Sequence, residues 1–177
     1  MDSKKVLVVV DMQYDFIDGS LGSEQAQAIV QNVVKKIEDF DGDIVLTQDT
    51  HTEEYLSTVE GKHLPVPHCI SGTHGHAIHS DVMKAVERHM AQHKVTFVEK
   101  ATFGSVKLPA IICGENYDTI EIVGLCTDIC VISNVLLLKA FCPEQEFIVD
   151  SSCCAGVTPE SHEAALQVLK SCHISVE

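Results

Sequence analysis

The sequence predicts an α/β protein built on a doubly wound, mostly parallel sheet of about six strands with helices on both faces. Two observations support this prediction. Short β-branched apolar runs alternate along the chain with segments whose apolar residues recur at helical spacing. The first run, KVLVVV at 5–10, also lacks a polar interruption, which is typical of a parallel strand covered on both faces. Because 177 residues is an ordinary size for one domain, we expect a single domain over 1–177.

The first half of the chain is expected to contain three strands and two helices. The apolar run KVLVVV ends at Asp11, and Ser23 is placed to cap the helix that follows. Within that helix, Ile29, Val33 and Ile37 recur at helical spacing. The strands are expected at 5–10, 43–49 and 94–100, and the helices at 23–40 and 82–90.

The second half continues the alternation and brings the expected strands to six. Thr127 can cap one of its helices, and Pro159 suits the first turn of the other. The segment 50–76 is rich in His, Gly and Pro, and long loops of this kind usually carry function. The strands are expected at 119–125, 146–150 and 173–177, and the helices at 127–142 and 159–172.

Composition argues against two classes of partner. The chain has 26 acidic and 12 basic residues, a net charge of −14, so it lacks the cations that neutralise phosphates in nucleic-acid binding. No apolar run approaches the roughly 18 residues of a membrane span. The run that follows the N-terminal lysines is too short for a signal peptide. We therefore expect a soluble, cytoplasmic protein that binds neither nucleic acid nor membrane.

The eight cysteines are expected to be free thiols in a reducing compartment, because a chain of this size does not need disulfides. Cys142, for example, lies in an apolar helical segment. Cys69 and the adjacent Cys153 and Cys154 lack the CxxC spacing of zinc and redox sites. Cys130 differs because it lies one turn into a helix after a strand, where the helix dipole favours a thiolate.

Ionisable residues fall at four expected strand ends, the edge of an open α/β sheet where ligands bind. Asp11, Asp49, Lys100 and Cys130 follow the first, second, third and fourth strands. A thiol needs a nearby base or cation to become a good nucleophile, and Asp11 and Lys100 supply both. The backbone N–H of Cys130, with one from the turn just before it, could receive an oxyanion. The alternative is that polar residues are simply common at strand ends.

A second group of residues has the character of a metal site. Asp49 and His51 lie two apart on an extended segment, so their side chains share one face. Glu60 and His68 follow in the same loop, and carboxylates with imidazoles suit zinc or another first-row divalent ion. The chain has 10 histidines, so chance pairing is the alternative. Six of them are expected to face solvent: His63, His74, His76, His79, His89 and His93.

The chain resembles the isochorismatase-like cysteine hydrolases, and among them the nicotinamidases most closely. Five sequence motifs carry the resemblance in order and extend from the first strand to the fourth helix. They are VVVDMQYDFIDG at 8–19, TQDTH at 47–51, VPHCISGTHG at 66–75, VEKATFGS at 98–105 and EIVGLCTDICV at 121–131.

The resemblance implies a role for each member of the first group. It implies that Asp11 is the general base and acid, that Lys100 is the third member of the triad and that Cys130 is the nucleophile. It also implies oxyanion donors at the backbone of Cys126 and Cys130, with a cis peptide bond before Cys126.

The resemblance further implies a divalent metal ion, most simply zinc, with iron or manganese as alternatives. Asp49, His51 and His68 would be three of its ligands. Glu60 is the preferred fourth ligand and His63 the alternative.

The expected function is metal-dependent hydrolysis of nicotinamide to nicotinate and ammonia through a thioester, with pyrazinamide as a further substrate. Phe16 and Phe103 would be apolar walls for the ring, or else core residues. One alternative is a cysteine hydrolase of another small amide, such as a carbamoyl or ureido compound. Another is a non-catalytic α/β module that binds metal. The resemblance also implies a homo-oligomer.

Overall fold

The sheet in this computed structural model, which describes residues 3–177, contains six parallel strands in the order β3-β2-β1-β4-β5-β6. The predicted doubly wound parallel sheet is therefore confirmed. Its strands are β1 (Lys5–Val10), β2 (Asp43–Asp49), β3 (Val95–Lys100), β4 (Thr119–Leu125), β5 (Glu146–Ala155) and β6 (Ser175–Val176).

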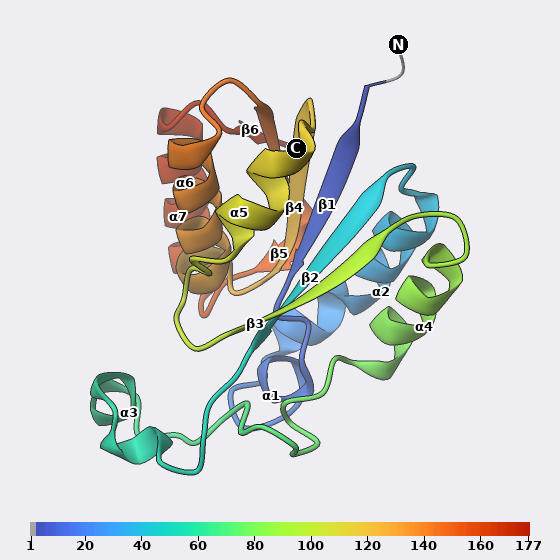
Figure 1. The fold of residues 1–177 in the computed structure, drawn as a ribbon. Coiled ribbons are helices and arrows are strands. Elements are labelled where there is room, and N and C mark those ends of the chain that lie inside the picture. The colour runs from blue at the N-terminus through green and yellow to red at the C-terminus, as the bar shows by residue number, and fades with distance from the viewer. Residues whose placement is uncertain (1–2) are drawn as a thin grey trace.

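Helices cover both faces of the sheet (Figure 1). On one face lie α2 (Glu24–Asp39) and α4 (Ser80–His89). On the other lie α5 (Leu108–Ile112), α6 (Ile132–Phe141) and α7 (Pro159–Ser171). Two short helices, α1 (Tyr14–Ile17) and α3 (Val59–His63), lie beyond the carboxyl ends of the strands. The remaining turns are η1 (Tyr55–Ser57), η2 (Cys113–Glu115) and η3 (Thr127–Val131).

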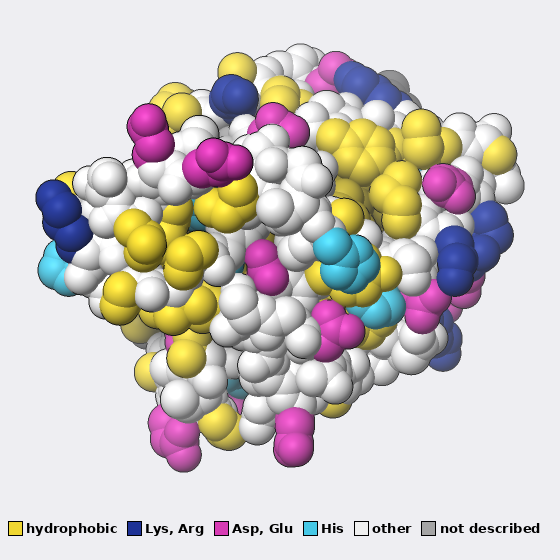
Figure 2. Space-filling view, turned by 90° about the horizontal axis from the view of Figure 1, so that it is seen from below, with side chains coloured by type: hydrophobic (Ala, Val, Ile, Leu, Met, Phe, Trp, Pro, Cys, Tyr) yellow, Lys and Arg dark blue, Asp and Glu magenta, His cyan; other side chains and the backbone are white. Residues whose placement is uncertain are grey.

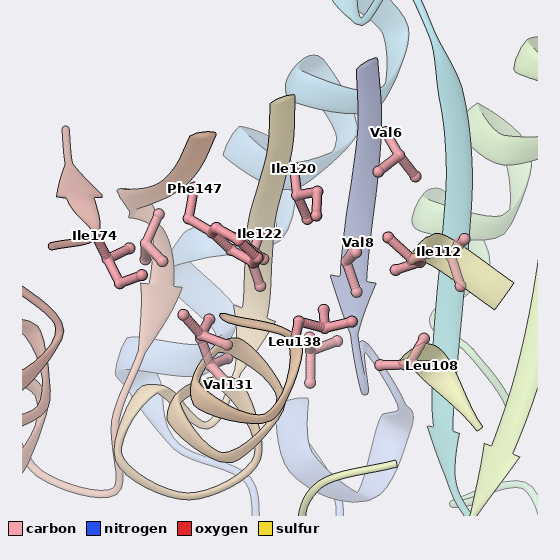
Figure 3. Packing of buried hydrophobic residues seen from close by; sticks show 14 of the residues in the cluster. Val6, Val8, Leu108, Ile112, Ile120, Ile122, Val131, Leu138, Phe147 and Ile174 are labelled. Atoms are coloured by element: carbon pink, nitrogen blue, oxygen red, sulfur yellow. The ribbon is translucent and has the colours of Figure 1, made fainter. Parts of the chain in front are cut away.

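The central strand β1 contributes side chains to two hydrophobic cores. Val6 and Val8 pack into the core beneath α5, α6 and α7, which Figure 3 shows, whereas Leu7 and Val9 pack into the core beneath α2 and α4. All four side chains are at most 1% exposed. Each contributes about 1.5–3 kcal/mol by leaving water. This burial on both faces explains why β1 has no polar interruption.

Several predicted helix boundaries are confirmed by capping contacts. Ser23 Oγ accepts a hydrogen bond from Ala26 N at 3.0 Å and begins α2. Pro159 occupies the first turn of α7, where Thr158 caps the helix. The predicted cap at Thr127 is wrong, because its Oγ1 lies 2.8 Å from His162 Nδ1 and the turn that follows is π-helical.

Other differences from the expected elements have local causes. Strand β5 runs to Ala155, five residues beyond the predicted end at residue 150, and so includes both Cys153 and Cys154. The helices α1, α3 and α5 are four or five residues long, too short to show a helical period in the sequence. His89 was expected to face solvent but is buried, with Nε2 2.8 Å from Gly42 O.

The expectation that all cysteines are free thiols is wrong. Cys113 and Cys142 form a disulfide that connects η2 to the end of α6. The two residues are 29 positions apart, and an apolar surrounding in the sequence does not distinguish a buried thiol from a buried disulfide. The reducing compartment was inferred from the absence of disulfides, so that expectation is no longer supported by the cysteines.

Within residues 3–177, no helix combines the length and the apolar character needed to cross a bilayer.

Candidate functional site

Functional side chains from four neighbouring strands meet at one edge of the sheet. In the order β3-β2-β1-β4, Lys100 ends β3, Asp49 ends β2, Asp11 follows β1 and Cys130 lies just after β4. Parallel strands bring their carboxyl ends to the same edge, so residues from distant parts of the chain become neighbours. The residues predicted at strand ends are therefore brought together.

Asp11 is fully buried and adopts a left-handed backbone conformation with a φ of 48°. This conformation is uncommon outside glycine, although Asp tolerates it better than most residues. Thr47 Oγ1 donates a hydrogen bond to Asp11 Oδ1 at 2.6 Å, and Lys100 Nζ lies 2.6 Å from Asp11 Oδ2. Burial raises the pKa of Asp11, and the ammonium group of Lys100 opposes this effect only in part. A carboxylate with a raised pKa is a better general base.

The ammonium group of Lys100 connects two parts of the site. Besides its contact with Asp11, Nζ lies 3.3 Å from Asp49 Oδ1 and 3.5 Å from Cys130 Sγ. Burial alone would lower the pKa of Lys100, but the two carboxylates and the thiol around it raise it. Lys100 is therefore a cation at neutral pH, which favours the ionised form of both carboxylates.

Cys130 places its thiol in the same buried space and is 5% exposed. Burial and the neighbouring Asp11 raise the pKa of the Cys130 thiol well above its ordinary value. The thiol is therefore neutral at rest, and it needs a base to accept its proton when it attacks.

The turn that carries Cys130 has an unusual backbone. The peptide bond between Leu125 and Cys126 is cis, as the resemblance implies. Gly124 has a φ of 119°, and a Cβ atom at this position would collide with the backbone of Val10. The N–H of Val131 donates to Cys126 O at 3.0 Å, which closes the turn. Cys126 and Cys130 then line the same cavity.

Four residues beside the thiol form a cluster suited to a metal ion. Asp49, His51, Glu60 and His68 each offer one ligand atom, and these atoms lie within 4.8 Å of one another. Asp49 Oδ2 lies 2.9 Å from His51 Nε2 and 3.5 Å from His68 Nε2. Glu60 Oε1 lies 3.6 Å from both Nε2 atoms. The ligand atoms therefore surround one point.

The orientation of His68 fits a role as a metal ligand. Its Nδ1 lies 2.9 Å from Val66 O, a contact that leaves Nε2 free to face Asp49 and Glu60. Metal-binding histidines usually donate their second ring nitrogen in this way. Hydrogen bonds from His51 and His68 lower the pKa of Asp49 despite its burial, so Asp49 is a carboxylate ready to bind a cation.

The donor set of two carboxylates and two imidazoles fits zinc, and also iron or manganese. Glu60, the preferred fourth ligand, belongs to the cluster, whereas the alternative His63 lies at the exposed end of α3 and outside it. The loop 50–76, expected to carry function, supplies three of the four residues.

A cavity of about 410 Å³ adjoins the thiol and the metal-ligating residues. Figure 2 shows the face of the molecule beyond the carboxyl ends of the strands, where hydrophobic side chains surround a hollow. Asp49, Glu60, His68, Cys126 and Cys130 contribute to the lining. The rest is mainly apolar and includes Phe16, Leu21, Ala26, Leu64, Phe103, Ile129 and Val157.

Both predicted apolar walls line this cavity. The ring of Phe16 is 8% exposed and lies 5.5 Å, centroid to centroid, from the ring of His68. Phe103 is 47% exposed, so the alternative that it packs in the core does not hold. Phe16 also packs into the core beneath α2 and α4, and both expectations hold for it.

Sequence reasoning missed three buried polar residues that position this site. Gln13 exchanges two hydrogen bonds with the backbone of Asp49, at 2.7 and 2.8 Å. Thr47 binds Asp11, as described above, and Asn134 Nδ2 donates to Cys130 O at 2.8 Å. Asn134 could have been found as the polar residue one helical turn after Cys130 in an otherwise apolar segment.

A larger groove of about 860 Å³ lies between α2 and the strands β4 and β5 but does not have this chemistry. Its centre is Lys36, which pairs with Glu121 at 3.1 Å and with Asp150 at 3.0 Å. The groove also contains the thiol of Cys153, and burial raises the pKa of this thiol to about 11. We therefore place the candidate functional site at the smaller cavity, where the Cys130 thiol lies beside the cluster suited to a metal ion.

The model of the Isochorismatase domain family matches residues 5–176 of the chain. No curated protein sequence matches the chain.

Solved structures with the same fold include nicotinamidases and pyrazinamidases. The nicotinamidase/pyrazinamidase of Bacillus subtilis is 26% identical, with 98% of each chain covered and a TM-score of 0.86. The pyrazinamidase/nicotinamidase of Streptococcus mutans is 27% identical, with 98% of this chain and 100% of that chain covered, and a TM-score of 0.86. The pyrazinamidase of Pyrococcus horikoshii, in complex with zinc, is 25% identical, with 98% of each chain covered and a TM-score of 0.79.

Proposed function

This chain belongs to the isochorismatase family, and we propose that it is a metal-dependent cysteine amidohydrolase that converts nicotinamide to nicotinate and ammonia. The observation that carries the proposal is the position of the Lys100 ammonium group. It lies within 3.5 Å of Asp11, Asp49 and Cys130, and so connects a nucleophile and its base to a metal-ligating residue. The similarity to nicotinamidases and pyrazinamidases supports the same substrate class.

In the first step, Cys130 Sγ attacks the carboxamide carbon while Asp11 accepts the thiol proton. The buried position of Asp11 supports this role, because its raised pKa favours proton acceptance. Lys100 stabilises the negative charge that passes from the carboxylate to the thiolate. The backbone N–H groups of Cys126 and Cys130 would stabilise the oxyanion of the tetrahedral intermediate.

In the second step, Asp11 gives the proton to the departing ammonia, and a thioester remains on Cys130. Asp11 then accepts a proton from water, which attacks the thioester carbon, and returns this proton to the Cys130 sulfur as the thioester bond breaks. The carboxylic acid released ionises to nicotinate, and its proton converts ammonia to ammonium. The reaction consumes one water and returns every protein group to its starting protonation state.

Asp49, His51, Glu60 and His68 would hold the metal ion, which supplies a Lewis-acidic binding point for the pyridine nitrogen. Phe16 and Phe103 would place apolar surface against the ring. Pyrazinamide has a ring nitrogen and a carboxamide in the same relation, so we propose it as a further substrate.

The alternative of a carbamoyl compound is less well supported when that compound carries a carboxylate. No Lys or Arg side chain is among the described residues that line the cavity. The single arginine of the chain, Arg88, lies in α4 and pairs with Glu38 on the face of the sheet covered by α2. An uncharged amide therefore suits this cavity better than an anionic one.

Ammonia release from nicotinamide tests the proposal most directly. We expect the zinc-loaded wild type to release ammonia, and expect Cys130→Ala and chelated wild type each to lose at least a hundredfold in kcat/KM. Cys153→Ala is the matched control, because it removes a buried thiol that lines the larger groove and not the cavity, and it should keep wild-type activity. Absence of ammonia from folded, zinc-loaded wild type would exclude nicotinamide as the substrate.

A further inference from the structure

The cavity extends beyond the space that a pyridine carboxamide requires. Its lining follows the order of the strands: Asp49 belongs to β2, Cys130 follows β4, and Val157 follows β5. The positions β2, β1, β4 and β5 are separated by three spacings of about 4.8 Å, so the two ends lie roughly 14 Å apart. A single six-membered ring held at the metal-ligating end and attacked by Cys130 does not reach the end beside Val157.

The far end of the cavity is apolar. We define it as Gly156 and Val157, which follow β5, together with Leu21, Gly22, Ser23 and Ala26 at the start of α2, the helix that packs against β5. None of these residues carries a charge. It contrasts with the end that holds the ionisable side chains of Asp49, Glu60 and His68. Cys130 lies between the two ends in the order of the strands.

The backbone N–H groups of Leu21, Gly22 and Val157 are already engaged within the protein. Leu21 N donates to Asp15 O at 2.8 Å, and Gly22 N donates to Gly19 O at 3.1 Å. Val157 N donates to Asp128 Oδ1 at 3.1 Å. Ser23 Oγ accepts from Ala26 N, as described for the start of α2. A charged substituent placed beside Leu21 and Val157 would lose its hydration without an opposite charge to replace it, whereas an apolar substituent would gain from burial.

From this arrangement we propose that the apolar end is a leaving-group subsite, and that the enzyme also hydrolyses secondary amides whose amine carries an apolar substituent. This inference rests on the proposed function. With the acyl ring at the metal-ligating end and the carbonyl carbon at Cys130, the amide nitrogen faces Asp11 and its substituent is directed along the cavity towards Val157. The N-substituent then occupies the apolar end.

The chemistry is balanced in the same way as for nicotinamide. The Cys130 Sγ–carbon bond forms, the carbon–nitrogen bond breaks, and Asp11 gives the thiol proton to the leaving amine. Water then cleaves the thioester, so that one amide and one water yield one carboxylic acid and one primary amine.

The experiment compares nicotinamide, N-butylnicotinamide and N-(carboxymethyl)nicotinamide as substrates of the zinc-loaded enzyme. We expect kcat/KM for N-butylnicotinamide to be at least tenfold higher than for nicotinamide, since each buried methylene contributes about 0.8 kcal/mol, or about fourfold. The carboxymethyl compound should be the poorest of the three, because its carboxylate would lose water at an apolar surface.

Substitutions test whether the substituent lies where the structure places it. Val157→Asp should lower the ratio of kcat/KM for N-butylnicotinamide to that for nicotinamide at least tenfold. Leu21→Ser should lower the same ratio, and serves if the first variant does not fold. Val168→Asp, which places the same charge on the outer side of α7, should leave the ratio unchanged.

The outcomes separate the two proposals. Hydrolysis of nicotinamide without faster hydrolysis of the butyl compound would overturn the subsite and leave the proposed function standing. A butyl preference that both variants retain would also overturn it, because the substituent would lie elsewhere. If the folded, zinc-loaded enzyme cleaves none of the three compounds, the proposed function fails, and the subsite fails with it.

Discussion

Lys100 Nζ and Asp11 Oδ2 lie 2.6 Å apart, and both side chains are at most 1% exposed. An ion pair of this kind is costly to form and more costly to break, because removing one partner leaves the other charge buried and unpaired. Here the cation faces two carboxylates, since Asp49 Oδ1 is 3.3 Å from the same Nζ. The pair therefore couples the stability of the fold to the chemistry of the site.

The first prediction concerns the loss of this cation. Lys100→Met should lower the free energy of unfolding by about 3–5 kcal/mol, because two buried carboxylates lose their partner. It should also lower kcat for nicotinamide at least a hundredfold. Adding Asp11→Asn should recover at least about 1 kcal/mol, because one unpaired charge is then removed. Urea unfolding measures these differences.

The control for this prediction is Lys107→Met, which removes an exposed lysine only seven residues further along the chain. Its free energy of unfolding should stay within about 0.5 kcal/mol of wild type. If Lys100→Met were as stable as this control, the ion pair would not contribute as we describe.

The second prediction concerns the fourth metal ligand. Glu60→Gln keeps the size of the side chain and removes its charge, so zinc should bind at least tenfold more weakly. Competition with a chromogenic chelator measures the affinity. His63→Ala should bind zinc like wild type, because His63 lies outside the ligand cluster. The reverse pattern would make His63 the ligand and Glu60 a bystander.

The third prediction concerns the turn before the nucleophile. Gly124→Ala should lower the free energy of unfolding by about 2–4 kcal/mol, because the new Cβ would meet the backbone of Val10 at a φ that L residues rarely adopt. Gly114→Ala is the matched control, since a Cβ there meets nothing within 4 Å. Equal stability of the two variants, measured by thermal unfolding, would show that the turn relaxes without cost.

The elements that the sequence predicted best are those in which one physical signal dominates. The run KVLVVV is buried on both faces, and its bounds as β1 agree with the predicted 5–10. Asp11, Asp49, Lys100 and Cys130 could be placed together because parallel strands share one carboxyl edge.

Features that depend on three-dimensional contact could not be predicted in this way. Nothing in the sequence around Cys113 and Cys142 indicates that they are close, because their pairing depends on how η2 packs against the end of α6. The same holds for Leu21 and Val157, two ordinary apolar residues that acquire a possible function only where the loops after β1 and β5 meet.

The last prediction concerns the pH dependence of stability at Lys36, which pairs with Asp150 at 3.0 Å in the larger groove. Although burial opposes it, hydrogen bonds from Ser152 and Lys36 lower the pKa of Asp150. A lowered pKa in the folded state stabilises the fold above the unfolded pKa, and this contribution is lost as the pH falls through the folded value. Lys36→Met should therefore cost about 1 kcal/mol at pH 7 and progressively less below about pH 4, whereas exposed Lys35→Met should cost little at either pH. Urea unfolding of both variants across this pH range measures these differences in the free energy of unfolding. If the destabilisation by Lys36→Met did not change with pH, the methylene groups of Lys36, and not its charge, would stabilise the fold.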